Sequence, residues 1–230
     1  MSFRKTMGKV CISGTSSGLG RYLLENVEDA FPCPRGEVPE ASIFVHAAFD
    51  KDFSNYARAI KNNVNWAIKI ADRAYEKVVF ISTIDILRQP QSSYAITKLL
   101  IEDLFSQTCK HSLSLRCSAM LGDYMRDNHF TEIIKGGVTT LSRDSMMNYI
   151  LHKDIAKFIK ECVVDGDAPG ILNFVSSENV LLDDLAKQDV RFGDYKYDSG
   201  KLDNRKLLNL FPEFDKTSLQ VVQEFTGELK

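Results

Sequence analysis

The stretch KVCISGTSSGLGRYLLENV, residues 9–27, decides how the chain begins to fold. It opens with a short β-rich apolar run, continues through a glycine-rich turn and ends with apolar residues at helical spacing. This order predicts a strand, a tight turn and a helix. A glycine-rich turn in that position lets the backbone approach a pyrophosphate, and the start of the helix supplies free N–H groups. Glycines that only serve a tight turn with positive φ angles are the alternative explanation.

The candidate nucleotide-binding residues lie in this turn and in the first residues of the helix. The serines offer hydroxyl donors, and the glycines leave room for a ligand close to the backbone. Alone the turn says little, but its place between a strand and a helix favours nucleotide binding. The candidates are Gly14, Ser16, Ser17, Gly18, Leu19 and Gly20.

Strands and helices alternate beyond the turn. Buried strands are predicted at residues 41–48, 77–83 and 113–120, and helices at residues 55–75 and 92–109. Such alternation is typical of a parallel sheet with helices on both faces. We therefore expect an α/β fold, a Rossmann-like doubly wound parallel sheet with a small C-terminal substrate lobe.

The domain organisation follows from the same pattern, which weakens after residue 120. We expect a single domain over residues 1–230. Residues 1–120 would form a dinucleotide-binding core, and residues 121–230 a smaller substrate-binding portion interleaved with that core.

The composition excludes several classes of function. Lysine and arginine number 29 and aspartate and glutamate 31, so the net charge of −2 gives no electrostatic case for nucleic acid. No apolar stretch is long enough to cross a bilayer, so no membrane partner is expected. The first residues indicate a strand rather than a signal peptide. The five cysteines lack metal-ligand spacing, so we expect no metal site and reduced thiols in a cytoplasmic protein.

A second informative stretch is SSYAITKLLIEDLF, residues 92–105. Tyr94 and Lys98 are four residues apart, so a helix presents them on one face, one turn apart. Tyrosine and lysine at this spacing are common by chance. The pair indicates a catalytic site only in combination with the segments that precede it.

Five segments occur in an order that carries a resemblance: GTSSGLG, FVHAA, NNVNWA, VVFIST and SYAITK. Together they resemble the extended short-chain dehydrogenases/reductases, the NAD-dependent epimerase/dehydratase family, whose members modify nucleotide sugars. The likeness runs over residues 9–187. LRCSAMLG and LHKDIAKFI are similar to later segments of that family, whereas the G-x-x-x-G-x-G spacing is more typical of the shorter single-domain branch. The chain would be an unusually short member.

The resemblance implies a role for each matching residue of the catalytic segments. Tyr94 would give or take the proton at the reacting carbonyl or alcohol. A free tyrosine titrates at about pH 10, and the ammonium of Lys98 and a positive cofactor ring would lower that pKa. Lys98 would also hold the nicotinamide ribose. Thr83 would hydrogen-bond the substrate oxygen, with Ser82 as the alternative if the register differs by one.

Further residues match the cofactor-binding side of the family. His46 ends a strand close to the cofactor and is expected to pack or cap rather than to catalyse. Ala47 and Ala48 would contribute backbone contacts and room beside the adenosine and ribose. Asn63 matches an asparagine with an architectural role.

Arg35 bears on the choice of cofactor. The second strand, within residues 30–35, ends in this arginine and not in the acidic residue that binds a ribose 2′-hydroxyl. An arginine suits a 2′-phosphate through bidentate charge-assisted bonds, which favours NADP over NAD. A solvated loop arginine is the equal alternative, and NAD remains possible.

The chain also departs from the family. Only residues 21–40 separate the glycine turn from the strand at 41–48, where the full fold has a strand, a helix and a further strand. The sheet is therefore expected to be narrower on the adenosine side, or its third strand very short. Ile84 stands where dehydratases of the family carry an acid, which counts against dehydration because an apolar side chain cannot protonate a leaving hydroxyl.

The sequence thus predicts an NAD(P)H-dependent oxidoreductase that reduces a keto group of a nucleotide-linked sugar, with Tyr94 as proton donor. One alternative is a sugar-nucleotide 4-epimerase with retained NAD. Another is a non-catalytic NAD(P)-binding sensor or scaffold protein. A homodimer is expected through the helices at residues 55–75 and 94–109, which form the usual pairing face in the extended family.

Overall fold

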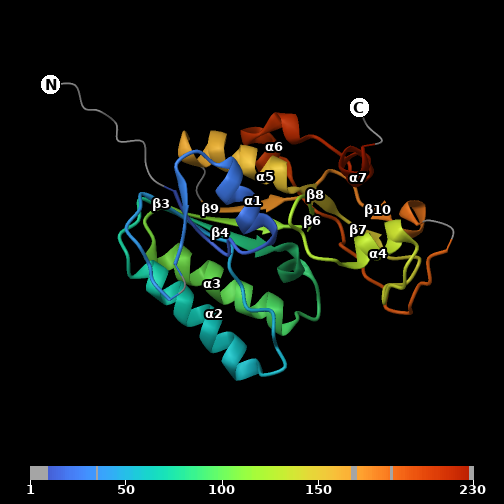
Figure 1. Ribbon diagram of the computed structural model, residues 1–230, viewed down its shortest axis with the longest axis horizontal. Helices are drawn as coiled ribbons and strands as arrows, with labels where there is room; N and C mark the ends of the chain where they lie inside the picture. Colours follow the sequence, from blue (N-terminus) through green and yellow to red (C-terminus); the bar gives the residue numbers. More distant parts are fainter. Residues whose placement is uncertain (1–9, 35, 167–169, 187–188, 228–230) are drawn as a thin grey trace.

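A parallel sheet forms the centre of the computed structural model, which describes residues 10–34, 36–166, 170–186 and 189–227. Six strands pair in the order β2-β1-β3-β4-β5-β9, all of them parallel (Figure 1). The expected α/β, Rossmann-like class is therefore confirmed. The strands are β1 (Val10–Ser13), β2 (Ala30–Pro32), β3 (Ile43–His46), β4 (Lys77–Thr83), β5 (Ser112–Cys117) and β9 (Gly170–Phe174).

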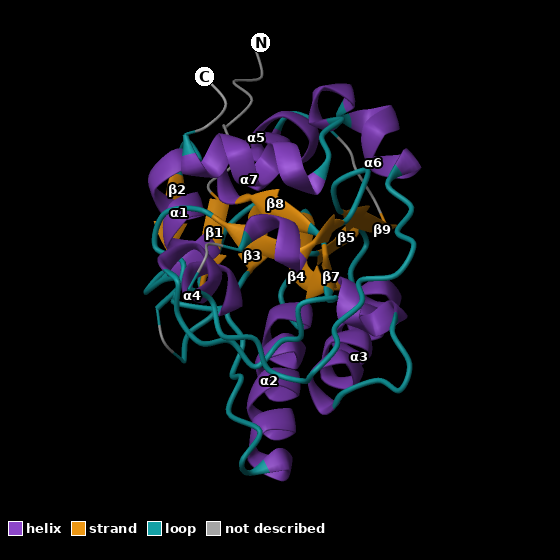
Figure 2. Ribbon diagram, turned by 90° about the vertical axis from the view of Figure 1, so that its right-hand side faces the viewer, coloured by secondary structure: helices purple, strands orange, loops and turns teal. Residues whose placement is uncertain are grey.

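Helices cover both faces of the sheet, as Figures 1 and 2 show. Successive side chains of a strand point to opposite faces, and in β4 both sets are apolar because both faces are buried. Val79 and Ile81 join the core under α1 and α5, whereas Val78 and Phe80 join the core under α2 and α3. On the first face lie α1 (Gly18–Asn26), α5 (His152–Phe158, continued by a π-helical segment Ile159–Val164) and α6 (Arg205–Leu210), and on the second α2 (Tyr56–Ala71) and α3 (Ser93–Thr108).

The C-terminal part adds two small sheets beside the main one. β6 (Ala119–Leu121) pairs in parallel with β8 (Tyr149–Leu151), and β7 (Met146–Met147) pairs antiparallel with β10 (Val180–Leu181). These strands share an apolar cluster with the remaining helices. The helices are α4 (His129–Lys135) and α7 (Ser218–Thr226), and the 3₁₀ turns are η1 (Ile84–Leu87), η3 (Leu182–Leu185) and η4 (Pro212–Phe214).

The sheet is narrow on the side of β2. This strand has three residues and pairs only with β1, so it is the edge of the sheet in the described part of the chain. No helix or strand occurs in the described residues between β2 and β3; a loop containing Val38 packs there against the core under α2. The narrower sheet follows from residues 31–40, whose three prolines cannot donate to a strand ladder.

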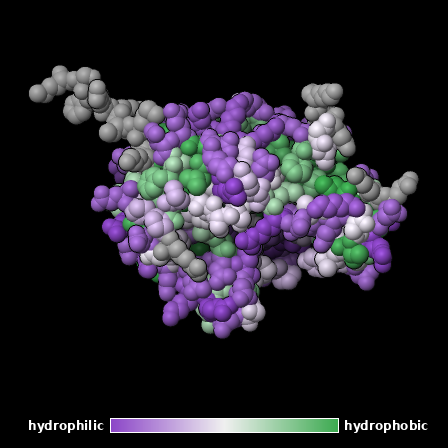
Figure 3. Space-filling view, in the orientation of Figure 1, coloured by the Kyte–Doolittle hydropathy of each residue, from purple (hydrophilic) through white to green (hydrophobic). Residues whose placement is uncertain are grey.

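The surface seen in Figure 3 is mostly hydrophilic, with apolar groups gathered in small patches. Among the described residues, no helix is both long enough and apolar enough to span a bilayer.

Candidate active site

The glycine turn and the end of β3 meet at the carboxyl edge of the sheet. Gly14 has a φ angle of 78°, and a Cβ atom there would lie 2.8 Å from the backbone nitrogen of Ala48. A Cβ atom on Gly20 would lie 2.4 Å from the carbonyl oxygen of Gly14. Both positions therefore require glycine. Ser13 fixes the approach, because its hydroxyl oxygen accepts the N–H groups of Ala47 and Ala48, each at 3.2 Å.

The first turn of α1 is covered by residues from a distant part of the chain. The N–H of Gly18 donates to the carbonyl oxygen of Tyr124 at 2.7 Å. Arg126 donates from Nη2 to the hydroxyl of Ser17 at 3.3 Å. Ser17 itself makes no capping bond from its side chain. Sequence reasoning missed Tyr124 and Arg126, since more than a hundred residues separate them from the turn.

The serines and the leucine of the turn differ in their surroundings. Ser16 is exposed and Ser17 half-buried, while the side chain of Leu19 is buried in the core under α1. Gly18 has a φ angle of 57°, and a Cβ atom there would meet nothing within 4 Å. The turn thus presents hydroxyls and backbone on its open side, which fits a pyrophosphate group.

His46 is a buried, neutral residue. Its Nδ1 lies 2.9 Å from the hydroxyl of Ser13. Because that oxygen already accepts two N–H groups, its own proton goes to Nδ1, which leaves the histidine proton on Nε2. Nε2 has no hydrogen-bond partner among the described residues. Burial, and secondarily the charge of Lys98, lowers the pKa of His46 to about 3, so the ring carries no charge at neutral pH.

Tyr94 and Lys98 lie where the helix α3 leaves the end of β4. The side chain of Ser92 caps the helix by accepting the N–H of Ala95 at 3.2 Å. Tyr94 is half-buried, and Phe49 contacts it edge to face with 5.1 Å between ring centroids. One turn later, the ammonium of Lys98 lies 5.7 Å from the centroid of the Tyr94 ring.

Lys98 is buried among aromatic rings. Its Nζ donates to the carbonyl oxygen of Ile81 at 2.6 Å and lies 4.2 Å and 4.6 Å from the ring centroids of Phe49 and Phe80. Burial lowers the pKa of Lys98 to about 7, and the nearby charge of Lys51 lowers it further. The lysine that would hold a ribose therefore changes its charge close to neutral pH.

The pKa of Tyr94 departs from the sequence-based expectation. Burial raises it above the usual tyrosine range, the Asp85 carboxylate raises it further, and a hydrogen bond with Thr83 lowers it only in part. Lys98 alone does not bring the expected lowering in this arrangement, because the lysine is itself desolvated and its ammonium donates to the carbonyl oxygen of Ile81. The part expected from a positive cofactor ring stays a prediction. At neutral pH Tyr94 is a protonated phenol.

The two hydroxyls at the end of β4 have different surroundings. Thr83 lies beside Tyr94 and also accepts the N–H of Asp85 at 3.2 Å, which caps η1. The hydroxyl of Ser82 is buried with no hydrogen-bond partner among the described residues. The structure brings Thr83 to Tyr94 in the register expected first.

A buried ion pair links the helix that carries Tyr94 and Lys98 to the neighbouring strand β5. Arg116 donates from Nε to both carboxylate oxygens of Glu102 at 3.1 Å and from Nη2 to one of them at 2.6 Å. Glu102 follows Lys98 by one helical turn, so the pair fastens α3 to β5. Sequence reasoning missed this pair.

Asn63 and Arg35 complete the set of predicted residues. The amide of Asn63 accepts the N–H of Asp50 at 2.8 Å and donates to its carbonyl at 3.0 Å, so it shapes the loop after β3. Arg35 lies outside the described residues. No group of three potential metal ligands occurs in the described parts of the chain.

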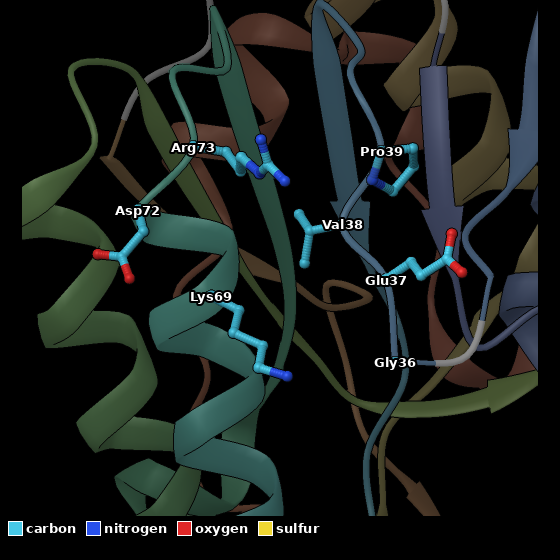
Figure 4. Close-up of a pocket in the computed structure, with 7 residues that line it drawn as sticks. All are labelled: Gly36, Glu37, Val38, Pro39, Lys69, Asp72 and Arg73. Atoms are coloured by element: carbon cyan, nitrogen blue, oxygen red, sulfur yellow. The ribbon is translucent and has the colours of Figure 1, made fainter.

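A shallow depression of 510 Å³ lies away from this site (Figure 4). It faces the C-terminal end of α2, which runs back from the carboxyl edge of the sheet towards the start of β4. It therefore lies at the opposite edge from Tyr94. Its lining consists of Gly36, Glu37, Val38, Pro39, Lys69, Asp72 and Arg73.

Comparisons with known proteins give matches in structure. No protein-family model matches the chain, and no curated protein matches its sequence. A dTDP-4-dehydrorhamnose reductase from Bacillus anthracis, solved with NADP, matches with a TM-score of 0.79 and 16% identity over 97% of this chain and 100% of that one. MoeE5, solved with UDP-glucuronic acid and NAD, matches with a TM-score of 0.77 and 15% identity over 95% and 97% of the two chains.

A UDP-N-acetylglucosamine 4-epimerase from Bacillus cereus matches with a TM-score of 0.74 and 17% identity over 96% of each chain. At such identities the likeness establishes the fold. The resemblance inferred from the sequence is confirmed at that level, because reductases and epimerases of nucleotide sugars share this architecture over nearly the whole chain.

Proposed function

We propose that this chain is an NAD(P)H-dependent oxidoreductase that reduces a keto group of a nucleotide-linked sugar. The observation that carries the proposal is the cluster of Thr83, Tyr94 and Lys98 at the carboxyl edge of the sheet, in which Tyr94 stays protonated. A reductase needs a proton donor at the carbonyl oxygen, and a protonated phenol can fill this role.

Each residue then has a defined task. Thr83 hydrogen-bonds the carbonyl oxygen and orients it towards Tyr94. The phenol of Tyr94 donates its proton to that oxygen as the carbonyl carbon receives a hydride, so that an alcohol forms and a phenolate remains until solvent reprotonates it. Lys98 binds the ribose hydroxyls beside this centre. The bound dinucleotide supplies the hydride.

The residues that would hold the dinucleotide fit it in part. The turn at Gly14 and Gly20 has no room for side chains, and the hydroxyl of Ser17 lies at the start of α1. Ala47 and Ala48 lie against this turn. The N–H of Gly18, in contrast, is bonded to Tyr124, so the loop carrying Tyr124 would have to release it for a phosphate to take its place. NADP as the preferred form stays a prediction that depends on Arg35.

Structures similar to this chain support the same class of reaction. The reductase from Bacillus anthracis was solved with NADP, and MoeE5 with UDP-glucuronic acid and NAD. A sugar-nucleotide 4-epimerase with retained NAD, in which Tyr94 would act first as a base, is the enzyme alternative.

A second candidate function rests on a specific observation. The edge strand β2 has three residues, and no strand lies beyond it in the described part of the chain. A site that has lost part of its adenosine side suits a protein that binds the cofactor weakly as a sensor or scaffold. The presence of both Tyr94 and Lys98 argues against a non-catalytic sensor or scaffold.

We also propose a homodimer through α2 and α3. Ile68, Ile96, Leu99 and Leu100 on these helices are exposed by 41%, 38%, 37% and 50%. Apolar side chains grouped on neighbouring helices mark a surface for association with a partner.

The test is turnover of NADPH with UDP- and dTDP-linked 4-keto sugars. We expect oxidation of NADPH by the wild-type protein and a decrease of about 10²- to 10⁴-fold for Tyr94→Phe. Tyr22→Phe, on the opposite face of the sheet, is the matched control and should retain full activity. Equal activity of Tyr94→Phe and wild type would refute the assigned proton donor.

A further inference from the structure

The depression shown in Figure 4 lies beside the loop that leads from β2 across β1 to β3. Parallel strands are usually joined through a helix, but the described residues between β2 and β3 contain none. The loop passes over the face of the sheet that also carries α2, because Val38 packs into the core under that helix. A space of 510 Å³ therefore remains between the loop and the C-terminal end of α2.

The two walls of this depression are fixed to each other. The hydroxyl of Tyr75, which follows α2, donates to the carbonyl oxygen of Pro39 in the loop at 2.6 Å. Tyr75 is buried, and its ring lies 5.1 Å from that of Phe44, measured between centroids. Within the loop, the thiol of Cys33 donates to the carbonyl oxygen of Glu37 at 3.2 Å. A ligand would enter a space whose walls are already in place, which lowers the entropic cost of binding.

The charged side chains around the depression point in different directions, as Figure 4 shows. Lys69, on the last turn of α2, and Arg73, just beyond it, both extend towards the loop. Asp72 points to the other side, and the carboxylate of Glu37 points away from α2. Val38 points from the loop towards the helix. The depression is therefore lined by two positive charges on one wall and by apolar groups on the other.

The two cations have no ion-pair partner among the described residues. Lys135, which is also exposed, reaches Asp127 at 3.2 Å. Like charges four residues apart on a helix repel each other. The carbonyl groups at the end of a helix favour cations, which explains the presence of basic residues at the end of α2. It does not explain why Lys69 and Arg73 both extend into the same depression.

We propose that Lys69 and Arg73 bind the phosphate group of a small phosphorylated molecule in this depression. A phosphate monoester carries a charge of about −2 at neutral pH, which two cations match. The guanidinium can bind two phosphate oxygens in parallel, while the ammonium acts as a point charge. The rest of the ligand lies against Val38 and Pro39, and the volume is within the range of small-molecule pockets.

This binding site is separate from the proposed active site. The depression lies at the opposite edge of the sheet from Tyr94. A ligand there would leave the reacting end of the fold free, so the inference does not depend on the proposed reaction.

The test is a calorimetric titration of the full chain, in a buffer without phosphate, with phenyl phosphate, phenol and inorganic phosphate. Phenyl phosphate should bind with a Kd of about 1 mM or lower. Phenol should not bind, because it lacks the charged group. Inorganic phosphate should bind more weakly than phenyl phosphate, because it has no apolar part to contact Val38 and Pro39.

Substitutions then identify the residues that bind the phosphate. Arg73→Gln should weaken the binding of phenyl phosphate by about 10- to 100-fold, because hydrogen bonds to a charged group are lost. Arg73→Lys should fall between this variant and wild type, because lysine keeps the charge but not the fork of donors. Lys61→Gln is the matched control. It removes an exposed cation of α2 that does not line the depression, so it should bind as wild type does.

Four results would overturn the inference. One is that phenyl phosphate does not bind to wild type, and another is equal binding by Arg73→Gln and wild type. Inorganic phosphate that binds as tightly as phenyl phosphate would show a site for the free ion only. Competition between phenyl phosphate and NADPH would show that the ligand occupies the proposed dinucleotide site. Absence of NADPH binding would instead contradict the proposed function and leave this inference standing.

Discussion

The side of the sheet around β4 and α3 differs sharply from the side around β2. At β4, the predicted residues Thr83, Tyr94 and Lys98 are positioned by a capped helix, by packed aromatic rings and by the buried Glu102–Arg116 pair. At β2, three residues of strand end the sheet, and a proline-rich loop takes the place of further elements. The residues proposed for proton transfer are thus firmly positioned, whereas the side proposed to bind adenosine has few elements.

We infer from this difference that the proposed catalytic geometry and the proposed cofactor affinity depend on separate parts of the fold. The reacting end depends on β4, η1 and α3, which are continuous in sequence. The adenosine end depends on β2 and its neighbours. We therefore expect substitutions near β4 to affect stability and turnover strongly. Substitutions near β2 should affect mainly cofactor binding.

The largest expected effect is on the buried ion pair. Glu102→Gln leaves Arg116 buried without its charge partner, which should lower the free energy of unfolding by about 3–5 kcal/mol. Urea denaturation of both proteins measures this difference in the free energy of unfolding. Glu25→Gln, which removes the exposed partner of Arg21, should have a much smaller effect because exposed ion pairs contribute little. Similar losses in both variants would show that the β4 side is not specially reinforced.

A smaller effect is expected in the glycine turn. Gly20→Ala places a Cβ atom 2.4 Å from the Gly14 carbonyl oxygen, so the turn must shift. We expect a loss of about 1–3 kcal/mol in unfolding free energy from overpacking, although alanine favours helices. NADPH affinity should fall as well. Unchanged stability and affinity would mean that the turn is more adaptable than its contacts indicate.

The charge of Lys98 should make stability depend on pH. Its pKa is about 7 in the folded protein, below the usual lysine value of 10.5. Between these values the unfolded chain binds a proton that the folded protein does not. Stability therefore rises with pH in this window, with a slope of at most about 1.4 kcal/mol per pH unit.

The difference in unfolding free energy between wild type and Lys98→Met, measured from pH 6 to pH 10, isolates this contribution. Below about pH 7 the lysine is charged in both states, and the slope should vanish. A difference that stays constant over the whole range would contradict a lowered pKa for Lys98.

The smallest effect on stability is expected at the proposed dimer surface. Leu100→Asp adds a charge to an exposed position, so the monomer should change by about 0.5 kcal/mol or less. Light scattering should nevertheless show a shift from dimer to monomer. Leu219→Asp, on the exposed face of α7, is the control and should leave the mass unchanged. A monomeric wild type would refute the dimer.

The sequence predicted the layers and the positions of Tyr94 and Lys98 on one helix well because those signals are local. The apolar runs gave β1, β3 and β4, and the four-residue spacing placed Tyr94 and Lys98 on one helix face. The missing strand near β2 was also predicted, from the shortness of residues 21–40.

The remaining features depend on contacts across the chain that no local pattern reveals. Tyr197 reaches Asp85, and Tyr124 reaches Gly18, over separations of more than a hundred residues. The raised pKa of Tyr94 has a related cause: burial and a neighbouring carboxylate raise it beside a lysine that is itself desolvated. Spacing alone cannot report desolvation.

The most direct test is a parallel fluorescence titration of the purified protein with NADPH and NADH. We expect saturable binding of NADPH, weaker binding of NADH, and a loss of the NADPH preference in Arg35→Ala. Binding of neither reduced cofactor, with no NAD found in the purified protein, would contradict it. The reduced adenosine side would then have lost its ligand, and the Tyr94 site would not be that of a dinucleotide-dependent reductase.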